Sequence, residues 1–202
     1  MGKLKKYLFV LLTGALATGC ASRPEAGQEQ LQEAKFRICD SEGNIALAVG
    51  RMYFMNGKKK EKVLENINIQ RSRIAMGFLN EISDRVTAGE LRHYADFATD
   101  KLYACARREG LNIGKPRELA RICYARVDIP FFLIVFKKQG MEKKQAIDKV
   151  STMFNRGTVY PEKLITSVAD VVYSPASEQE NQKLMGTVFW SCLYQWQPKS
   201  SQ

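Results

Sequence analysis

The chain has 202 residues and a formal net charge of +10, with 45% hydrophobic and 10% aromatic residues. This apolar content excludes an intrinsically disordered protein, and the length allows one sizeable core or two small ones. The positive charge favours anionic partners such as phosphates, acidic proteins or lipid headgroups.

The first twenty residues have the order of a secretory signal peptide. A basic start with Lys3, Lys5 and Lys6 precedes an apolar stretch over residues 7–16, and small residues then lead to Cys20. The apolar stretch is half as long as the roughly twenty residues that a membrane-spanning helix needs. The pattern therefore favours a leader, residues 1–19, over the alternative of a transmembrane anchor.

The end of this leader, Ala17-Thr18-Gly19-Cys20, resembles the lipobox of bacterial lipoproteins, although alanine stands at the first position, where leucine is usual. The resemblance implies cleavage before Cys20, lipid on its sulfur and amino group, and export across the inner membrane. Ala21 after the cysteine implies sorting to the periplasmic face of the outer membrane. More than one acyl chain gives lasting attachment, and this location argues against a nucleic-acid partner.

Residues 20–34 are polar and predict a tether that becomes helical toward its end. As a flexible chain, such a tether would span about 20 Å and separate the globular part from a membrane.

A series of helices is predicted over residues 35–109. The first covers 36–56 and ends at Asn56-Gly57, a left-handed C-cap. Its apolar stripe consists of Ile38, Ile45, Val49, Met52 and Tyr53. A second helix is predicted over 58–67 and a third around 74–82. A fourth begins at Thr87, where Thr87 and Glu90 have the spacing of a capping box. Its predicted buried face is Leu91, Tyr94, Ala98, Leu102 and Cys105.

The pattern then recurs, which indicates a duplication. Cys123 opens an apolar segment that ends at Gln139-Gly140, as Cys39 opens one that ends at Asn56-Gly57. A short helix over 141–150, a helix start at Pro161 and a capping box at Ser177–Glu180 follow; the last helix carries Leu184, Val188, Cys192 and Trp196. We expect an all-α fold of two tandem disulfide-closed units of about four helices each. The units cover 35–109 and 116–196, and a polar tail follows at 197–202.

One segment opposes the helical interpretation. Residues 129–136 contain Pro130 and are rich in β-branched and aromatic side chains, which favours a buried strand. The corresponding segment of the first unit, 45–54, has a helical pattern. We therefore expect a helix with a kink or a start near Pro130.

Four cysteines remain after Cys20, an even number that predicts disulfides in an exported chain. The duplication favours Cys39 with Cys105 and Cys123 with Cys192, so that each unit joins its own first and last helices. The alternatives are Cys105 with Cys123 and Cys39 with Cys192, or a free or metal-binding set, although no C-x-x-C spacing exists.

Catalytic motifs are not found. Glu90, His93 and Asp96 have the spacing of a helical metal site, but the second unit has no counterpart, which favours a solvated helix face. Nucleophile elbows, phosphate loops and zinc-protease motifs are absent from the sequence. We expect a protein that is not an enzyme and uses no cofactor or metal.

Lysines surround both predicted glycine turns. They are Lys58, Lys59, Lys60 and Lys62 at the first turn and Lys137, Lys138, Lys143 and Lys144 at the second. Lysines before a glycine cap suit the C-terminus of a helix, but lysines that open the next helix oppose its dipole, so helix stability does not explain the lysines of this second kind. The lysines of both turns serve either general solubility or two matched patches for anionic lipid headgroups, lipopolysaccharide phosphates or an acidic protein.

Two functions follow. The first is a membrane-anchored structural or interaction lipoprotein of the cell envelope. The alternative is an immunity protein, because Phe189-Trp-Ser-Cys-Leu193 is similar to the cysteine-closed last helix of helical immunity proteins against type VI amidases. This resemblance covers one half of the chain at most and implies no binding residue. The sequence does not indicate an oligomeric state.

Overall fold

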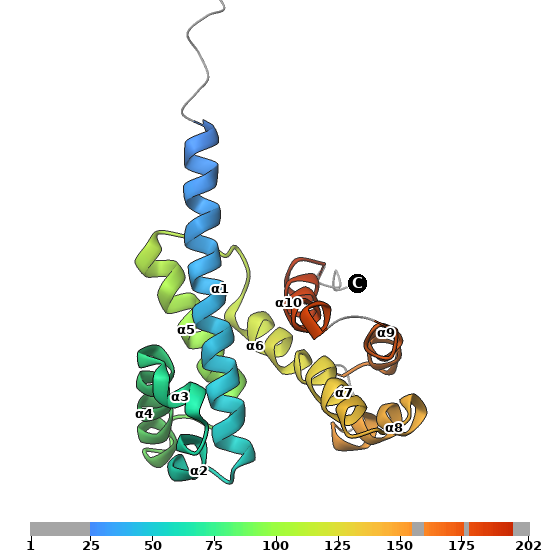
Figure 1. Ribbon diagram of the computed structural model, residues 1–202. Coiled ribbons are helices and arrows are strands. Elements are labelled where there is room, and N and C mark those ends of the chain that lie inside the picture. Colours follow the sequence, from blue (N-terminus) through green and yellow to red (C-terminus); the bar gives the residue numbers. More distant parts are fainter. Residues whose placement is uncertain (1–24, 155–159, 176–177, 196–202) are drawn as a thin grey trace, which may run out of the picture.

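The computed structural model describes residues 25–154, 160–175 and 178–195, and this part of the chain is helical without strands (Figure 1). The all-α expectation is confirmed. The helices are α1 Glu25–Met55, α2 Lys60–Leu64, α3 Ile67–Arg71, α4 Arg73–Thr87, α5 Tyr94–Glu109, α6 Arg117–Arg126, α7 Asp128–Lys138, α8 Lys143–Met153, α9 Glu162–Val172 and α10 Glu178–Gln195. The predicted leader, Cys20, Ser177, Trp196 and the polar tail lie outside the described residues.

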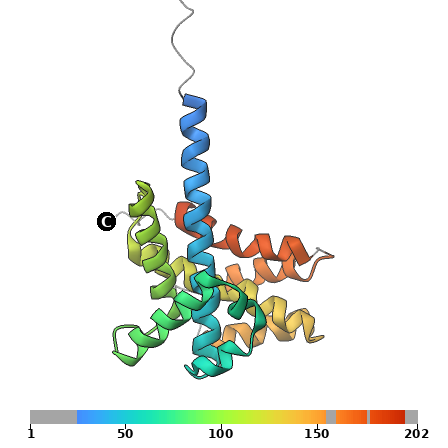
Figure 2. The same cartoon turned by 60° about the vertical axis from the view of Figure 1, so that its left-hand side comes forward.

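Helix α1 is the long axis of the molecule. Its 31 residues span about 45 Å, and its N-terminal part projects beyond the other helices (Figures 1 and 2). Residues 25–34, predicted as a tether that becomes helical only late, are helical from Glu25 onward. Ile38, predicted to be buried, is 50% exposed. Among the described helices, α1 included, none combines the length and apolarity needed to cross a bilayer.

The larger apolar core is formed by α1 to α6 together with Phe189 and Leu193 of α10. A smaller core joins α7, α8 and α9 with Val188 of α10. Helix α6, which the prediction assigned to the second unit, packs against α5 and contributes Leu119, Ala120 and Cys123 to the larger core. The boundary between cores therefore falls near Val127 rather than at 110–115, and the tandem two-unit organisation stays a prediction.

Two predicted helix boundaries are wrong. A helix was expected to start at Thr87, but α4 ends there, because Gly89 adopts a left-handed φ of 76° and the amide of Glu90 donates to the carbonyl of Arg85. The predicted helix over 58–67 is divided into α2 and α3 at Asn66, whose side chain accepts a hydrogen bond from the amide of Asn68 and caps α3.

The predictions for the proline and glycine positions hold. Residues 129–136 are helical, and Pro130 lies in the first turn of α7, where a missing amide hydrogen is tolerated. The break between α6 and α7 at Val127 divides the long segment expected from Cys123. Gly57 and Gly140 have φ values of 67° and 76° and end α1 and α7 as left-handed caps.

Candidate functional site

The two disulfides join Cys39 with Cys105 and Cys123 with Cys192, which is the pairing expected from the repeat. The Cα–Cα distances are 5.3 and 5.5 Å. The first bond fixes α5 antiparallel to α1, and the second fixes α10 to α6. Each therefore connects the first and last helices of a predicted unit.

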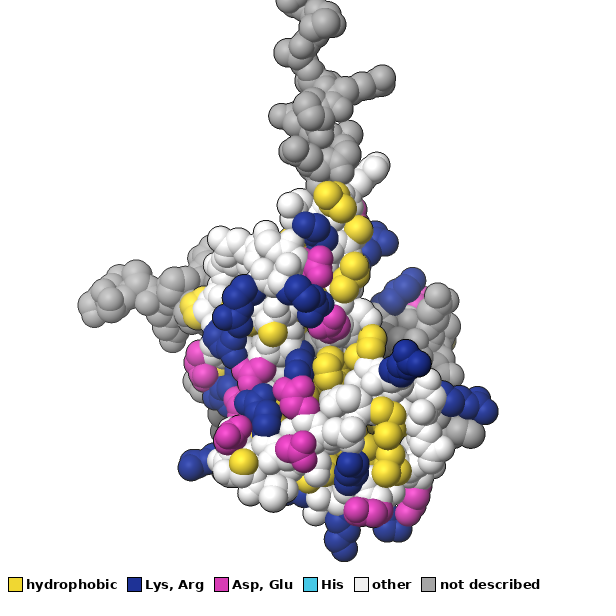
Figure 3. Space-filling model, turned by 90° about the vertical axis from the view of Figure 1, so that its left-hand side faces the viewer, with side chains coloured by type: hydrophobic (Ala, Val, Ile, Leu, Met, Phe, Trp, Pro, Cys, Tyr) yellow, Lys and Arg dark blue, Asp and Glu magenta, His cyan; other side chains and the backbone are white. Residues whose placement is uncertain are grey.

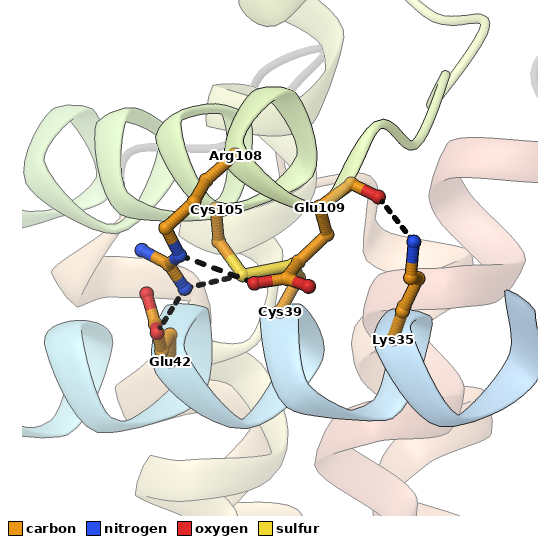
Figure 4. The surroundings of a disulfide bond; sticks show 6 residues. All are labelled: Lys35, Cys39, Glu42, Cys105, Arg108 and Glu109. Atoms are coloured by element: carbon orange, nitrogen blue, oxygen red, sulfur yellow. Dashed lines mark hydrogen bonds and ion pairs between the residues drawn. A yellow bond between two sulfur atoms is a disulfide. The ribbon is translucent and has the colours of Figure 1, made fainter. Parts of the chain in front are cut away.

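Polar contacts on both sides of the first disulfide hold the end of α5 against α1 (Figure 4). The Nη2 of Arg108 donates to Oε1 of Glu42 at 2.6 Å. One turn before Cys39 in α1, the Nζ of Lys35 donates to the carbonyl of Glu109 at 2.9 Å. The C-terminus of α5 is thereby held level with Lys35.

The first lysine cluster is displayed at the far end of α1. Lys58 and Lys59 are exposed and Lys60 is half-buried, and none of the three forms an ion pair with the described part of the chain. We call these three residues the distal loop. Lys58 has a φ of 62°, and its Nζ lies 5.2 Å from the ring centroid of Phe54. Lys62 is paired with Glu65 at 2.8 Å and is not part of the distal loop.

The second cluster differs from the first. The Nζ of Lys137 donates to the carbonyls of Val172 and Ser174 at 2.6 and 3.0 Å, where it satisfies acceptors at the C-terminus of α9. Lys143 is paired with Asp170, and Lys138 also has a partner. Only Lys144 is exposed without an ion pair within the described residues. Lys137 and Lys143 thus hold the helices of the smaller core together.

A buried polar cluster, which the sequence did not indicate, lies where the two cores meet. Arg51 of α1 is 5% exposed and Asp128 of α7 is 0% exposed. The Nε of Arg51 donates to Oδ1 of Asp128 at 2.9 Å, and Nη2 lies 2.8 Å from the same oxygen as an ion-pair contact without hydrogen-bond geometry. The hydroxyl of Tyr94 donates to the other carboxylate oxygen. The guanidinium lies 4.2 Å from the ring centroid of Phe131.

Burial sets the protonation of this cluster. It raises the pKa of Asp128, whereas Arg51 and the hydrogen bond from Tyr94 act in the opposite direction. Burial also raises the pKa of Tyr94, and the charge of Asp128 raises it further. The Nε of Arg51 and the hydroxyl of Tyr94 donate to the carboxylate, and the cluster joins α1, α5 and α7, whereas Nη2 of Arg51 has no hydrogen-bond acceptor among the described residues. This arrangement supports a structural role.

His93, the single histidine, is next to this cluster. It does not lie on a helix face with Glu90, because α5 begins only at Tyr94. Its Nδ1 accepts a hydrogen bond from the amide of Ala95 at 3.1 Å and caps α5, and its ring stacks on that of Tyr94. Burial lowers the pKa of His93, although Asp128 and Asp96 oppose this effect. The described residues contain no group of three acidic, cysteine or histidine side chains arranged to hold a metal.

Comparisons with protein-family models, with curated proteins and with solved structures find no match for this chain. The functional argument therefore depends on the sequence motifs and on the geometry described above.

Proposed function

We propose that this protein is a lipid-anchored component of the bacterial cell envelope that acts by binding rather than by catalysis. It is tethered through Cys20 and presents the distal loop to an anionic partner away from the tether. The partner is an anionic lipid surface or an acidic envelope protein.

The observation that carries this proposal is the geometry of α1. The helix begins five residues after Cys20 and continues without interruption to Met55, three residues before the distal loop. A helix of this length separates its ends by about 45 Å. On this proposal Cys20 precedes the N-terminal end of α1 and the distal loop follows its C-terminal end, so the lysines would be held away from the membrane that carries the anchor.

The disulfides support an exported location. Disulfide bonds persist in oxidising compartments such as the bacterial periplasm and are rare in the cytosol. Both bonds are largely enclosed by the helices that they join, since Cys39, Cys105 and Cys123 are buried. They would therefore be expected to form during folding after export.

The anchor is tested by metabolic labelling with radioactive palmitate. The wild-type chain should incorporate the label and sediment with membranes, whereas Cys20→Ser should do neither. Incorporation of equal label into Cys20→Ser would contradict the anchor. The same samples should show no free thiol at the four remaining cysteines under non-reducing conditions.

The distal loop is tested by bridging of vesicles. The protein is reconstituted in neutral phosphatidylcholine vesicles, and phosphatidylglycerol vesicles are added. Docking is followed by energy transfer between dyes in the two populations. The variant Lys58→Gln, Lys59→Gln, Lys60→Gln should abolish docking, and salt should weaken docking by the wild type.

A matched control removes the same charge elsewhere. Lys149, Lys163 and Lys183 are exposed and lie on α8, α9 and α10, so their triple replacement by glutamine should leave docking unchanged. Equal loss in both triple variants would mean that net charge alone, and not the distal loop, is responsible. Absence of docking by the wild type would leave an acidic protein as the partner, to be sought by crosslinking of intact envelopes.

One observation favours the second candidate, a protein that neutralises a secreted envelope toxin. Phe36 of α1 and Trp190 of α10 lie 4.5 Å apart between ring centroids, and Trp190 stacks on Tyr194, which is 51% exposed. Trp190 is partly buried and Tyr194 is exposed, and both residue types are enriched at the centres of protein interfaces. A toxin encoded next to this protein should be inhibited by the wild type and at least tenfold less by Tyr194→Ser; absence of inhibition would exclude this candidate.

A further inference from the structure

A pocket of about 640 Å³ lies between the C-terminal turns of α5 and the loop 110–116 that leads to α6. Its volume is in the range of ligand sites in proteins. The side chains that matter for its chemistry are Tyr103, Arg107, Leu111, Ile113, Lys115 and Arg117. None of these belongs to the distal loop or to the buried polar cluster.

The shape of the loop is fixed by local hydrogen bonds. Gly110 ends α5 with a φ of 68°, and the amide of Leu111 donates to the carbonyl of Ala106 at 2.7 Å. The hydroxyl of Tyr103 donates to the carbonyl of Lys115 at 2.6 Å. The side chain of Asn112 accepts from the amide of Gly114 at 2.8 Å. The pocket is therefore a preformed part of the fold.

Cationic and apolar side chains together line this pocket. Arg107 and Lys115 form no ion pair with any residue that the structure describes, whereas Arg117 is paired with Asp100 and lies over the ring of Tyr103. Two uncompensated positive charges thus remain. Leu111 and Ile113, of which Ile113 is buried, are apolar residues of the lining.

We propose that this pocket binds a phosphate group that carries an apolar substituent, and specifically the headgroup of an anionic phospholipid. A phosphate has one or two negative charges and several acceptor oxygens, which match the two free cations. Leu111 and Ile113 would contact the carbon chain next to the phosphate. A free inorganic phosphate has no carbon chain that could make this contact.

The position of the pocket favours a lipid source. Lys35 is bonded to the end of α5, ten residues after the start of α1, so the pocket lies about 15 Å along the helix from Glu25. This is the end from which the chain leads to Cys20, and it is opposite to the distal loop. Figure 3 shows, on the face below the projecting part of α1, lysine and arginine side chains interspersed with aspartate and glutamate side chains.

The test is native mass spectrometry of the full chain, purified from envelopes in maltoside micelles and mixed with phosphatidic acid or phosphatidylcholine. The lipid concentration at which the wild type retains bound lipid should be at least tenfold lower for phosphatidic acid than for phosphatidylcholine. The variant Arg107→Gln, Lys115→Gln should lose this preference, since each charge-assisted bond contributes about tenfold or more. Both side chains are outside the core, and circular dichroism checks that the variant is folded.

Two further variants separate the sources of the effect. Leu111→Ser should weaken the binding of phosphatidic acid at least tenfold. It should leave unchanged the weak competition of inorganic phosphate for the pocket. If Leu111→Ser has no effect, and inorganic phosphate competes fully, the lipid assignment is overturned in favour of a free phosphate. Lys149→Gln, Lys163→Gln removes the same charge from exposed positions of α8 and α9 and should keep the lipid preference, which separates this site from an effect of net charge. A preference that survives in the Arg107 and Lys115 variant would overturn the site itself.

Discussion

Replacement of Arg51 by methionine tests the buried ion pair between α1 and α7. Methionine keeps most of the aliphatic volume but leaves the carboxylate of Asp128, 0% exposed, without its cation. Removal of one partner of a buried ion pair costs about 3–5 kcal/mol of unfolding free energy. We expect a loss of this size, measured by urea unfolding at pH 8 with the disulfides intact.

The loss should depend on pH in a defined direction. Burial already raises the pKa of Asp128, and the positive charge of Arg51 opposes this rise more strongly than any other group. Without Arg51 the pKa of Asp128 rises further. At pH values between this raised pKa and the ordinary pKa of an aspartate, the folded variant therefore binds a proton that the unfolded chain does not bind. The stability of the variant relative to wild type should therefore improve as the pH falls from 8 through this raised pKa toward 4.

Removal of both charges should reverse most of the damage. In Arg51→Met, Asp128→Leu, the remaining defect is the hydroxyl of Tyr94, which loses its acceptor at a cost of about 1–3 kcal/mol. Addition of Tyr94→Phe removes this defect, and the triple variant should be within about 2 kcal/mol of wild type. A single variant that loses less than 1 kcal/mol, with a difference from wild type that does not change with pH, would refute the reasoning.

Three further predictions concern the disulfide, the glycines and the histidine. Replacement of Cys123 and Cys192 by serine opens a 69-residue loop and should lower the unfolding free energy by about 4 kcal/mol in urea titrations. Gly43→Ala should lower the melting temperature, because the new methyl group would lie 2.0 Å from the hydroxyl of Tyr124, which is buried in α6. Gly77→Ala meets no atom within 4 Å and should stabilise α4 by about 0.5–1 kcal/mol. The lowered pKa of His93 means that the folded state binds fewer protons than the unfolded state, so stability should fall as the pH drops through 6.5.

Each of these has its own control. His93→Ser keeps an oxygen that can cap α5 and should remove the pH dependence near 6.5; a persistent dependence would assign it to another group. For the disulfide, the urea midpoint is measured before and after reduction, in the wild type and in the variant without Cys123 and Cys192. If reduction lowers the midpoint equally in both proteins, the second disulfide does not stabilise the fold. Equal effects of alanine at Gly43 and Gly77 would contradict the close approach of α1 and α6.

The candidate sites could be predicted from the sequence only in part. The lysines around Gly57 and Gly140 look equivalent along the chain, and their difference arises because α9 brings acceptors to Lys137 and an acidic partner to Lys143. Arg51 and Asp128 are 77 residues apart and belong to no motif. The pocket lies around the segment between the two predicted units, for which the sequence indicated no role.

The sequence by itself determined the helical class and the glycine caps, and among the alternatives it left open it favoured the cysteine pairing that the structure has. These properties depend on local preference and on the repeated order of residues, which can be read without knowing how helices pack. The tertiary structure decided which lysines stay free, which buried charges meet and where the cores divide. Such properties depend on contacts between residues distant in the chain, and only the packing of α6, α7 and α10 against the first helices brings them together.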